Sequence, residues 1–154
     1  MRILGVDYGR RRLGLAISDA AGLLARPWQT IPAGGGVAQA AAAVAACLAE
    51  DADLTADVSA IVVGLPRRLS GEDTELTAEV RRFAAALNAA TERDVHLQDE
   101  RLSSHEAEAR LAELERDWRV RKARLDAAAA AVILQDYLDR GRAPVTAEVE
   151  ETDP

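Results

Sequence analysis

Three acidic residues that lie far apart in the sequence stand where a small enzyme could gather carboxylates for catalysis. Asp7 lies inside an apolar segment, Glu100 follows the short segment 94–99, and Asp126 is embedded in the alanine-rich sequence LDAAAAAVIL. A carboxylate among apolar residues is costly to bury unless it is paired, hydrogen-bonded or bound to a metal. If the three side chains converge, their oxygen atoms form a site for Mg²⁺ or Mn²⁺, ions that catalyse phosphodiester hydrolysis.

Each of these acids also has a structural explanation, which the sequence alone leaves open. Asp7 could cap the turn that follows its strand. Glu100 could be an exposed loop residue paired with Arg101. Asp126 could be a helix N-terminal acid favoured by the helix dipole.

The other residues capable of chemistry have simpler interpretations. His96 lies within a predicted strand and His105 within the first turn of a predicted helix, and neither shows the spacing of a zinc site. Cys47 is the single cysteine, so an internal disulfide is excluded. It is predicted to be a core residue of a helix.

Asp7 belongs to the sequence GVDYGRRRLGLAISD, which predicts a strand, a tight turn filled by Arg10, Arg11 and Arg12, and a second strand. In the second strand, apolar residues alternate with small ones, which is typical of a half-buried strand. The same alternation places Asp7 on one face with Ile3 and Gly5, and Gly5 leaves room beside it.

The remaining sequence predicts alternating helices and strands. A third strand at Arg26–Ile31 is expected at a sheet edge, because Pro27 cannot donate to a ladder. The later elements are a helix at Val37–Glu50, a strand at Ser59–Leu65, a helix at Glu72–Asn88, a strand at Asp94–Asp99, a helix from Ser103 and a last helix at Leu125–Arg140. The order βββαβαβαα predicts an α/β fold with a mixed five-stranded sheet and helices on both faces. Ligands of such folds bind at the carboxyl ends of the parallel strands.

Composition and charge set the class of protein. The chain has 154 residues, of which 49% are hydrophobic, and a net charge of −7. These values predict one globular domain over residues 1–141 and an acidic, flexible tail over 142–154. We find no signal peptide and no membrane-spanning run, so a soluble cytoplasmic protein is expected. The negative net charge argues mildly against a nucleic-acid partner, but arginines cluster locally, and local potential is what steers a polyanion.

Four segments in order resemble the YqgF family, which is also called Holliday-junction-resolvase-like and described as pre-16S ribosomal RNA nucleases. They are GVDYGRRRLGLAISD at 5–19, VVGLP at 62–66 with Ser70-Gly71 after it, DERLSS at 99–104, and LDAAAAAVILQDYLD at 125–139. The chain departs from the usual pattern at Ser104, where threonine is common. It also carries Arg67 and Arg68 where many relatives have apolar and amide residues.

The resemblance implies a ribonuclease-H-like fold and a nuclease that hydrolyses phosphodiester bonds. It also implies that Asp7, Glu100 and Asp126 are the catalytic residues and the ligands of Mg²⁺ or Mn²⁺. Candidate phosphate contacts are Arg10, Arg11, Arg67 and Arg68, although solvated surface arginines explain each of them as well.

Three functions follow from the resemblance. The first is processing of the 5′ end of precursor 16S ribosomal RNA, with that RNA or a small-subunit precursor as partner. The second is a resolvase of four-way DNA junctions, which would require a dimer. The third is a non-catalytic nucleic-acid-binding module or a truncated ATPase, against which the three intact acids argue. The sequence leaves the choice between monomer and homodimer open.

Overall fold

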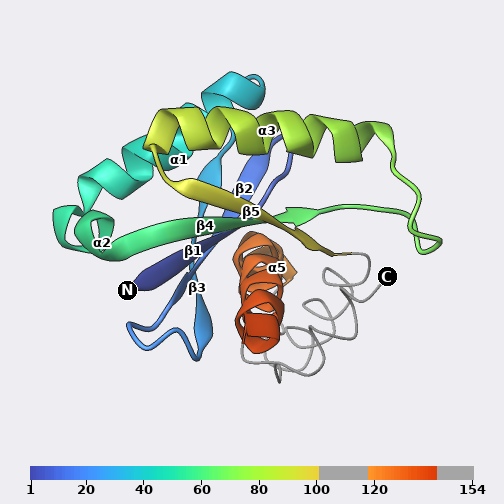
Figure 1. Cartoon of the computed structure of the whole chain (residues 1–154). Helices are drawn as coiled ribbons and strands as arrows, with labels where there is room; N and C mark the ends of the chain where they lie inside the picture. The colour runs from blue at the N-terminus through green and yellow to red at the C-terminus, as the bar shows by residue number, and fades with distance from the viewer. Residues whose placement is uncertain (101–117, 142–154) are drawn as a thin grey trace, which may run out of the picture.

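Alternating apolar side chains near the N-terminus form an antiparallel meander of three strands in the computed structural model, which describes residues 1–100 and 118–141 (Figure 1). The strands are β1 (Arg2–Asp7), β2 (Arg12–Ser18) and β3 (Ala25–Pro32). β2 lies between the other two and pairs antiparallel with both. β3 is at an edge of the sheet, as Pro27 predicts.

Two later strands extend the sheet on the other side of β1. β4 (Val58–Leu65) is rich in β-branched residues and pairs parallel with β1, and β5 (Asp94–Asp99) pairs parallel with β4. The strand order is therefore β3-β2-β1-β4-β5. Because β1, β4 and β5 are parallel, their carboxyl ends lie at one edge of the sheet, and this edge positions the candidate site.

Helices cover both faces of the sheet (Figure 1). α1 (Val37–Glu50) and α3 (Glu75–Thr91) pack together over one face. Between them and the sheet lies the main apolar core, which includes Leu4, Val6, Leu15, Val44 and Phe83. α2 (Ala52–Asp57) is a short helix that leads directly into β4.

α5 (Trp118–Gly141) covers the opposite face and contacts β1, β2 and β3. A second apolar cluster joins Ile133 and Leu134 of this helix to Val62 of β4. Gly5 makes the close approach possible, because a Cβ atom at that position would lie 2.8 Å from Cβ of Leu134. The room that Gly5 leaves is thus filled by the helix.

The predicted α/β architecture is confirmed, with several differences in the helices. α1 and β5 have the predicted bounds. α3 begins three residues later than predicted, because Thr74 forms a reciprocal capping box with Thr77. α2 was not predicted; its first turn is capped by the side chain of Asp51, which accepts a hydrogen bond from the backbone N–H of Leu54.

The last helix shows the largest difference. It was predicted to begin at Leu125, after a charged break, but α5 begins at Trp118. Arginine and lysine are good helix formers, so a charged segment without an apolar stripe can still be helical. The predicted helix from Ser103 and the predicted tail at 142–154 lie outside the described residues. No helix within residues 1–100 and 118–141 is long and apolar enough to cross a membrane.

Candidate active site

Asp7 and Glu100 come together at the carboxyl edge of the sheet. Asp7 is the last residue of β1, and Glu100 directly follows β5. The backbone N–H of Glu100 donates to the carbonyl of Leu65 at 3.2 Å, which continues the β4–β5 ladder by one residue. The two side chains are joined by a hydrogen bond. Two carboxyl groups can form such a bond only if one of them is protonated.

The surroundings of Asp7 shift its pKa strongly. Burial raises the pKa of Asp7 well above its ordinary value, and the negative charges of Glu100 and Asp126 and the hydrogen bond to Glu100 raise it further. Asp7 therefore holds a proton more readily than an ordinary aspartate does. A strongly perturbed carboxyl at the end of a buried strand is typical of functional sites.

Asp126 belongs to the same group, and it projects from α5. Its charge acts on Asp7, and its Oδ2 atom is buried and lies 3.2 Å from Nε of Arg12. Because α5 begins at Trp118, Asp126 lies about two turns inside the helix. The helix dipole acts on the first turn, so it does not explain an acid at this position.

Two glycines let the acidic residues approach the sheet. A Cβ atom at Gly64 of β4 would lie 2.9 Å from both Cδ and Oε2 of Glu100 and 2.6 Å from Cδ1 of Ile133. A Cβ atom at Gly14 of β2 would collide with the backbone carbonyl of Asp126. Glycine at these positions is therefore required by close packing around the carboxylates.

The chemistry of the donor set suits a hard divalent cation, although the carboxylates are not arranged around one. All three side chains offer oxygen donors, which are the ligands that Mg²⁺ and Mn²⁺ prefer. Within the described part of the chain, no three His, Cys, Asp or Glu side chains form a group that could hold a metal ion. Asp7 and Glu100 are bound to one another, and Asp126 is paired with Arg12.

Arg10 and Arg11 lie in the loop between β1 and β2, where the sequence predicts phosphate contacts. Arg10 binds Glu79 of α3, with Nη2 3.0 Å from Oε1, and Glu79 also accepts a hydrogen bond of 2.5 Å from the hydroxyl of Tyr8. Tyr8, Arg10 and Glu79 line a cavity of about 400 Å³ beside the start of α1. This cavity lies on the α1–α3 side of the sheet, whereas Asp7 faces α5. Arg11 is exposed.

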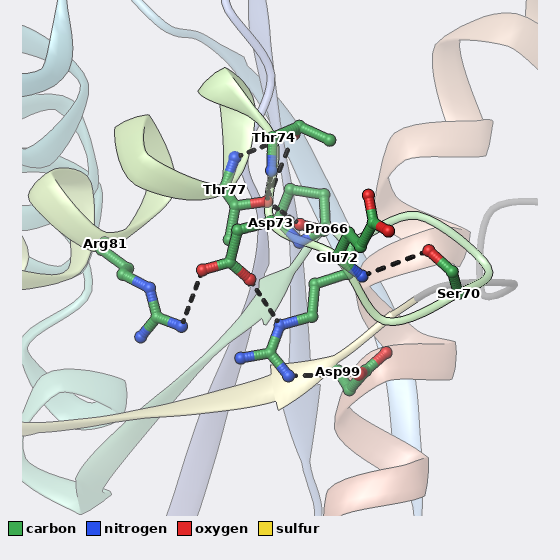
Figure 2. A network of polar contacts seen from close by, with 9 residues as sticks. Pro66, Ser70, Glu72, Asp73, Thr74, Thr77, Arg81 and Asp99 are labelled. Atoms are coloured by element: carbon green, nitrogen blue, oxygen red, sulfur yellow. Dashed lines mark hydrogen bonds and ion pairs between the residues drawn. The ribbon is translucent and has the colours of Figure 1, made fainter.

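The other two candidate phosphate contacts follow β4. Nε of Arg67 lies 3.2 Å from Oδ1 of Asp73, and its Nη1 lies 3.8 Å from Oδ2 of Asp99. Asp73 also pairs with Arg81 of α3, as Figure 2 shows. Ion pairs therefore join the loop after β4 to both α3 and the end of β5. Arg67 thus belongs to an ion-pair network that includes Asp99, the residue immediately before Glu100. Arg68 is exposed.

Sequence reasoning missed the role of Arg12. It was expected to lie in the turn, but it is the first residue of β2 and pairs with Asp126. A signal was available in the strand period. Asp7 is the cross-strand partner of Gly14, so Arg12 must share the α5-facing side of the sheet.

The antiparallel meander, the two added parallel strands and the helices on both faces define the ribonuclease-H-like class of α/β folds, which confirms the predicted fold. The structure of T. thermophilus RuvC in complex with Holliday junction substrate has this fold. It aligns with a TM-score of 0.51 and 19% sequence identity, over 92% of this chain and 96% of that chain.

Sequence comparisons identify the family. The model of the RuvX family, described as Holliday junction resolvase, matches residues 1–140. A Nocardioides sp. protein named "Putative pre-16S rRNA nuclease" is 42% identical over 153 residues, which are 97% of this chain and 96% of that protein. A protein of the same name from Anaeromyxobacter dehalogenans is 44% identical over 144 residues, covering 94% of this chain and 100% of that protein.

The chain belongs to the RuvX family, which is the YqgF family that the sequence motifs resemble. This is a family of nucleases and resolvases, so the protein is a hydrolase that acts on ester bonds of nucleic acids. The predictions of family and enzyme class are thereby confirmed.

Proposed function

We propose that this nuclease is a divalent-metal-dependent endonuclease that processes the 5′ end of precursor 16S ribosomal RNA in the cytoplasm, with residues 1–141 as its catalytic domain. The observation that carries the proposal is the grouping of Asp7, Glu100 and Asp126 on the α5-facing side of the sheet edge, with the charges of the latter two acting on Asp7. The names of the relatives support the choice of substrate.

The three carboxylates are the proposed ligands of Mg²⁺ or Mn²⁺. Bound there, a divalent cation would activate water for attack on a phosphodiester and would stabilise the leaving oxygen. Carboxylate ligands must be deprotonated. Asp7 therefore has to give up the proton that it shares with Glu100, and cation binding should strengthen as the pH rises.

The surroundings of the carboxylates support a role in orienting them. Glu100 is held against β4 by its backbone bond to Leu65 and by the absence of a side chain at Gly64. Asp126 is held by the packing of α5 on Gly14. Rigid elements thus carry all three carboxylates, which is what precise catalytic geometry requires.

The loops after β1 and β4 flank the same sheet edge, and they carry the proposed phosphate contacts. Arg11 and Arg68 are exposed and can reach a polyanion directly. Arg10 and Arg67 are engaged with Glu79 and Asp73, so they would contribute only by exchanging a carboxylate for a phosphate.

Cleavage by purified protein tests this function. The substrate is a labelled RNA that spans the junction between the 5′ leader and 16S ribosomal RNA, with Mn²⁺ or Mg²⁺ added or removed by EDTA. We expect metal-dependent cutting that Asp7→Asn abolishes. Asp53→Asn is the matched control, because Asp53 is an exposed carboxylate of α2, at the amino end of β4. Equal cutting by Asp7→Asn and the wild-type protein would contradict the proposed centre.

A second candidate substrate is a four-way DNA junction, which the description of the family model favours. The same preparation is therefore tested on a labelled junction, and its oligomeric state is measured by light scattering. Cutting of the junction but not of the RNA, by a dimeric protein, would favour the resolvase, because symmetric cleavage needs two sites related by a two-fold axis.

A further inference from the structure

Arg12 places a positive charge beside the cluster of three carboxylates. Its Nε atom lies 3.2 Å from Oδ2 of Asp126, an oxygen that is buried. The Arg12 side chain is 44% exposed and that of Asp126 is 28% exposed, so the pair lies at the rim of the site. A cation that bound to this cluster would compete with Arg12 for the Asp126 carboxylate.

The three carboxylates are divided between two kinds of partner. Asp7 is hydrogen-bonded to Glu100, whereas Asp126 is paired with Arg12. The described residues contain no group of three metal ligands already arranged to hold an ion. An ion that binds all three carboxylates must displace the guanidinium group of Arg12 from Asp126.

We propose that Arg12 competes with the divalent cation for Asp126, so that it holds the site in a low-affinity state until the ion displaces it. The inference rests on the proposed function, because it assumes that the three carboxylates bind a divalent ion. It concerns affinity for the metal and requires no nucleic acid.

The side chain of Arg12 can be changed without disturbing the turn in which its backbone takes part. A Cβ atom at Gly9 would lie 2.5 Å from the carbonyl oxygen of Arg12, so the close contact of the β1–β2 turn is with the Arg12 backbone. Arg12→Gln should therefore fold like the wild-type protein. Arg12→Lys retains the charge and should retain the competition.

The test is Mn²⁺ binding to the full chain without nucleic acid, measured by isothermal titration calorimetry and by the electron paramagnetic resonance signal of free Mn²⁺. We expect Arg12→Gln to bind Mn²⁺ about three- to tenfold more tightly than the wild-type protein, as loss of a partly exposed ion pair would give. Arg12→Lys should bind close to the wild-type affinity.

Two further variants make the result specific. Arg11→Gln removes the same charge from the neighbouring, exposed residue, and it should leave the affinity close to that of the wild-type protein. In the Asp126→Asn background, Arg12→Gln should produce no gain. Equal tightening by Arg11→Gln, or a gain that survives Asp126→Asn, would show that only the general field had changed and would overturn the inference.

The remaining outcomes separate this inference from the proposed function. Wild-type binding that Arg12→Gln leaves unchanged or weakens would overturn the competition and leave the metal centre standing. Absence of Mn²⁺ binding in all variants would contradict the metal centre, and the competition with it.

Discussion

The backbone carbonyl of Asp126 lies so close to Gly14 that a side chain at position 14 would collide with it. Gly14 is also the cross-strand partner of Asp7. Gly14 therefore determines how closely α5, which carries Asp126, packs against the strand position that pairs with Asp7. The separation of Asp7 and Asp126 depends on this contact between β2 and α5.

The first prediction is that Gly14→Ala displaces α5. Because the added methyl group meets backbone that cannot rotate away, we expect the free energy of unfolding to fall by about 3 kcal/mol, at the upper end of overpacking costs. Urea denaturation measures the change. Gly141→Ala is the control, because among the described residues a Cβ added there meets no atom within 4 Å apart from its chain neighbours and the backbone of its own helix. Equal stability of Gly14→Ala and the wild-type protein would contradict the close contact.

The second prediction concerns the pH dependence of stability. The pKa of Asp7 is raised in the folded protein, chiefly by burial. The folded protein therefore binds the Asp7 proton more tightly than the unfolded chain does. The stability that this gives is complete below the ordinary pKa of 3.8 and is lost as the pH rises through the raised pKa. Asn resembles protonated Asp, so metal-free Asp7→Asn should be more stable than the wild-type protein at neutral pH, and the difference should shrink on acidification.

Thermal unfolding in EDTA, measured between neutral pH and about pH 4, tests this behaviour. Asp53→Asn should show no such pH-dependent gain, because its carboxylate is exposed. A gain for Asp7→Asn that stays constant over the whole range would mean that the mutation acts through packing and not through ionisation.

Features of the site that depend on local pattern could be predicted from the sequence. The strand period places Asp7 on one face with Gly5, and apolar spacing gives α1 its bounds. The positions of Glu100 after a short strand and of Asp126 among alanines made them candidates, and the resemblance of four short motifs then implied that they are catalytic. These features need only the geometry of single elements and the order in which the elements follow one another.

Features that depend on contacts between distant segments could not be predicted. The pairing of Arg12 with Asp126 requires the packing of α5 on β2, and the contact of Glu100 with Gly64 requires the register of β4 and β5. The start of α5 was missed for a different reason. A charged segment has no apolar stripe, so its periodicity does not reveal a helix.

The third prediction concerns the hydrogen bond from Tyr8 to Glu79. Burial and this hydrogen bond raise the pKa of the Tyr8 hydroxyl to about 12. Tyr8→Phe keeps the ring contact with Phe83, whose centroid lies 4.7 Å away, and removes only the hydrogen bond. We expect a loss of about 1.5–3 kcal/mol in the free energy of unfolding, which is typical for a bond to a charged group.

Arg10→Gln provides the comparison for Tyr8→Phe, because it removes the other partner of Glu79. Arg10 is exposed, so water can replace it and the loss of stability should be smaller. Urea denaturation of the two variants gives both values. A larger loss for Arg10→Gln than for Tyr8→Phe would show that the ion pair, and not the hydroxyl, holds the loop after β1 to α3.

The fourth prediction separates the two arginines of the loop after β4. Each phosphate contact adds about 0.7 to the slope of log binding constant against log salt for a single strand. Arg68→Gln should lower the slope by about this amount, because Arg68 is exposed. Arg67→Gln should lower it less, because Asp73 and Asp99 already oppose its charge. Fluorescence anisotropy with labelled RNA in EDTA measures both slopes, and an equal decrease would show that Arg67 leaves its carboxylates for phosphate.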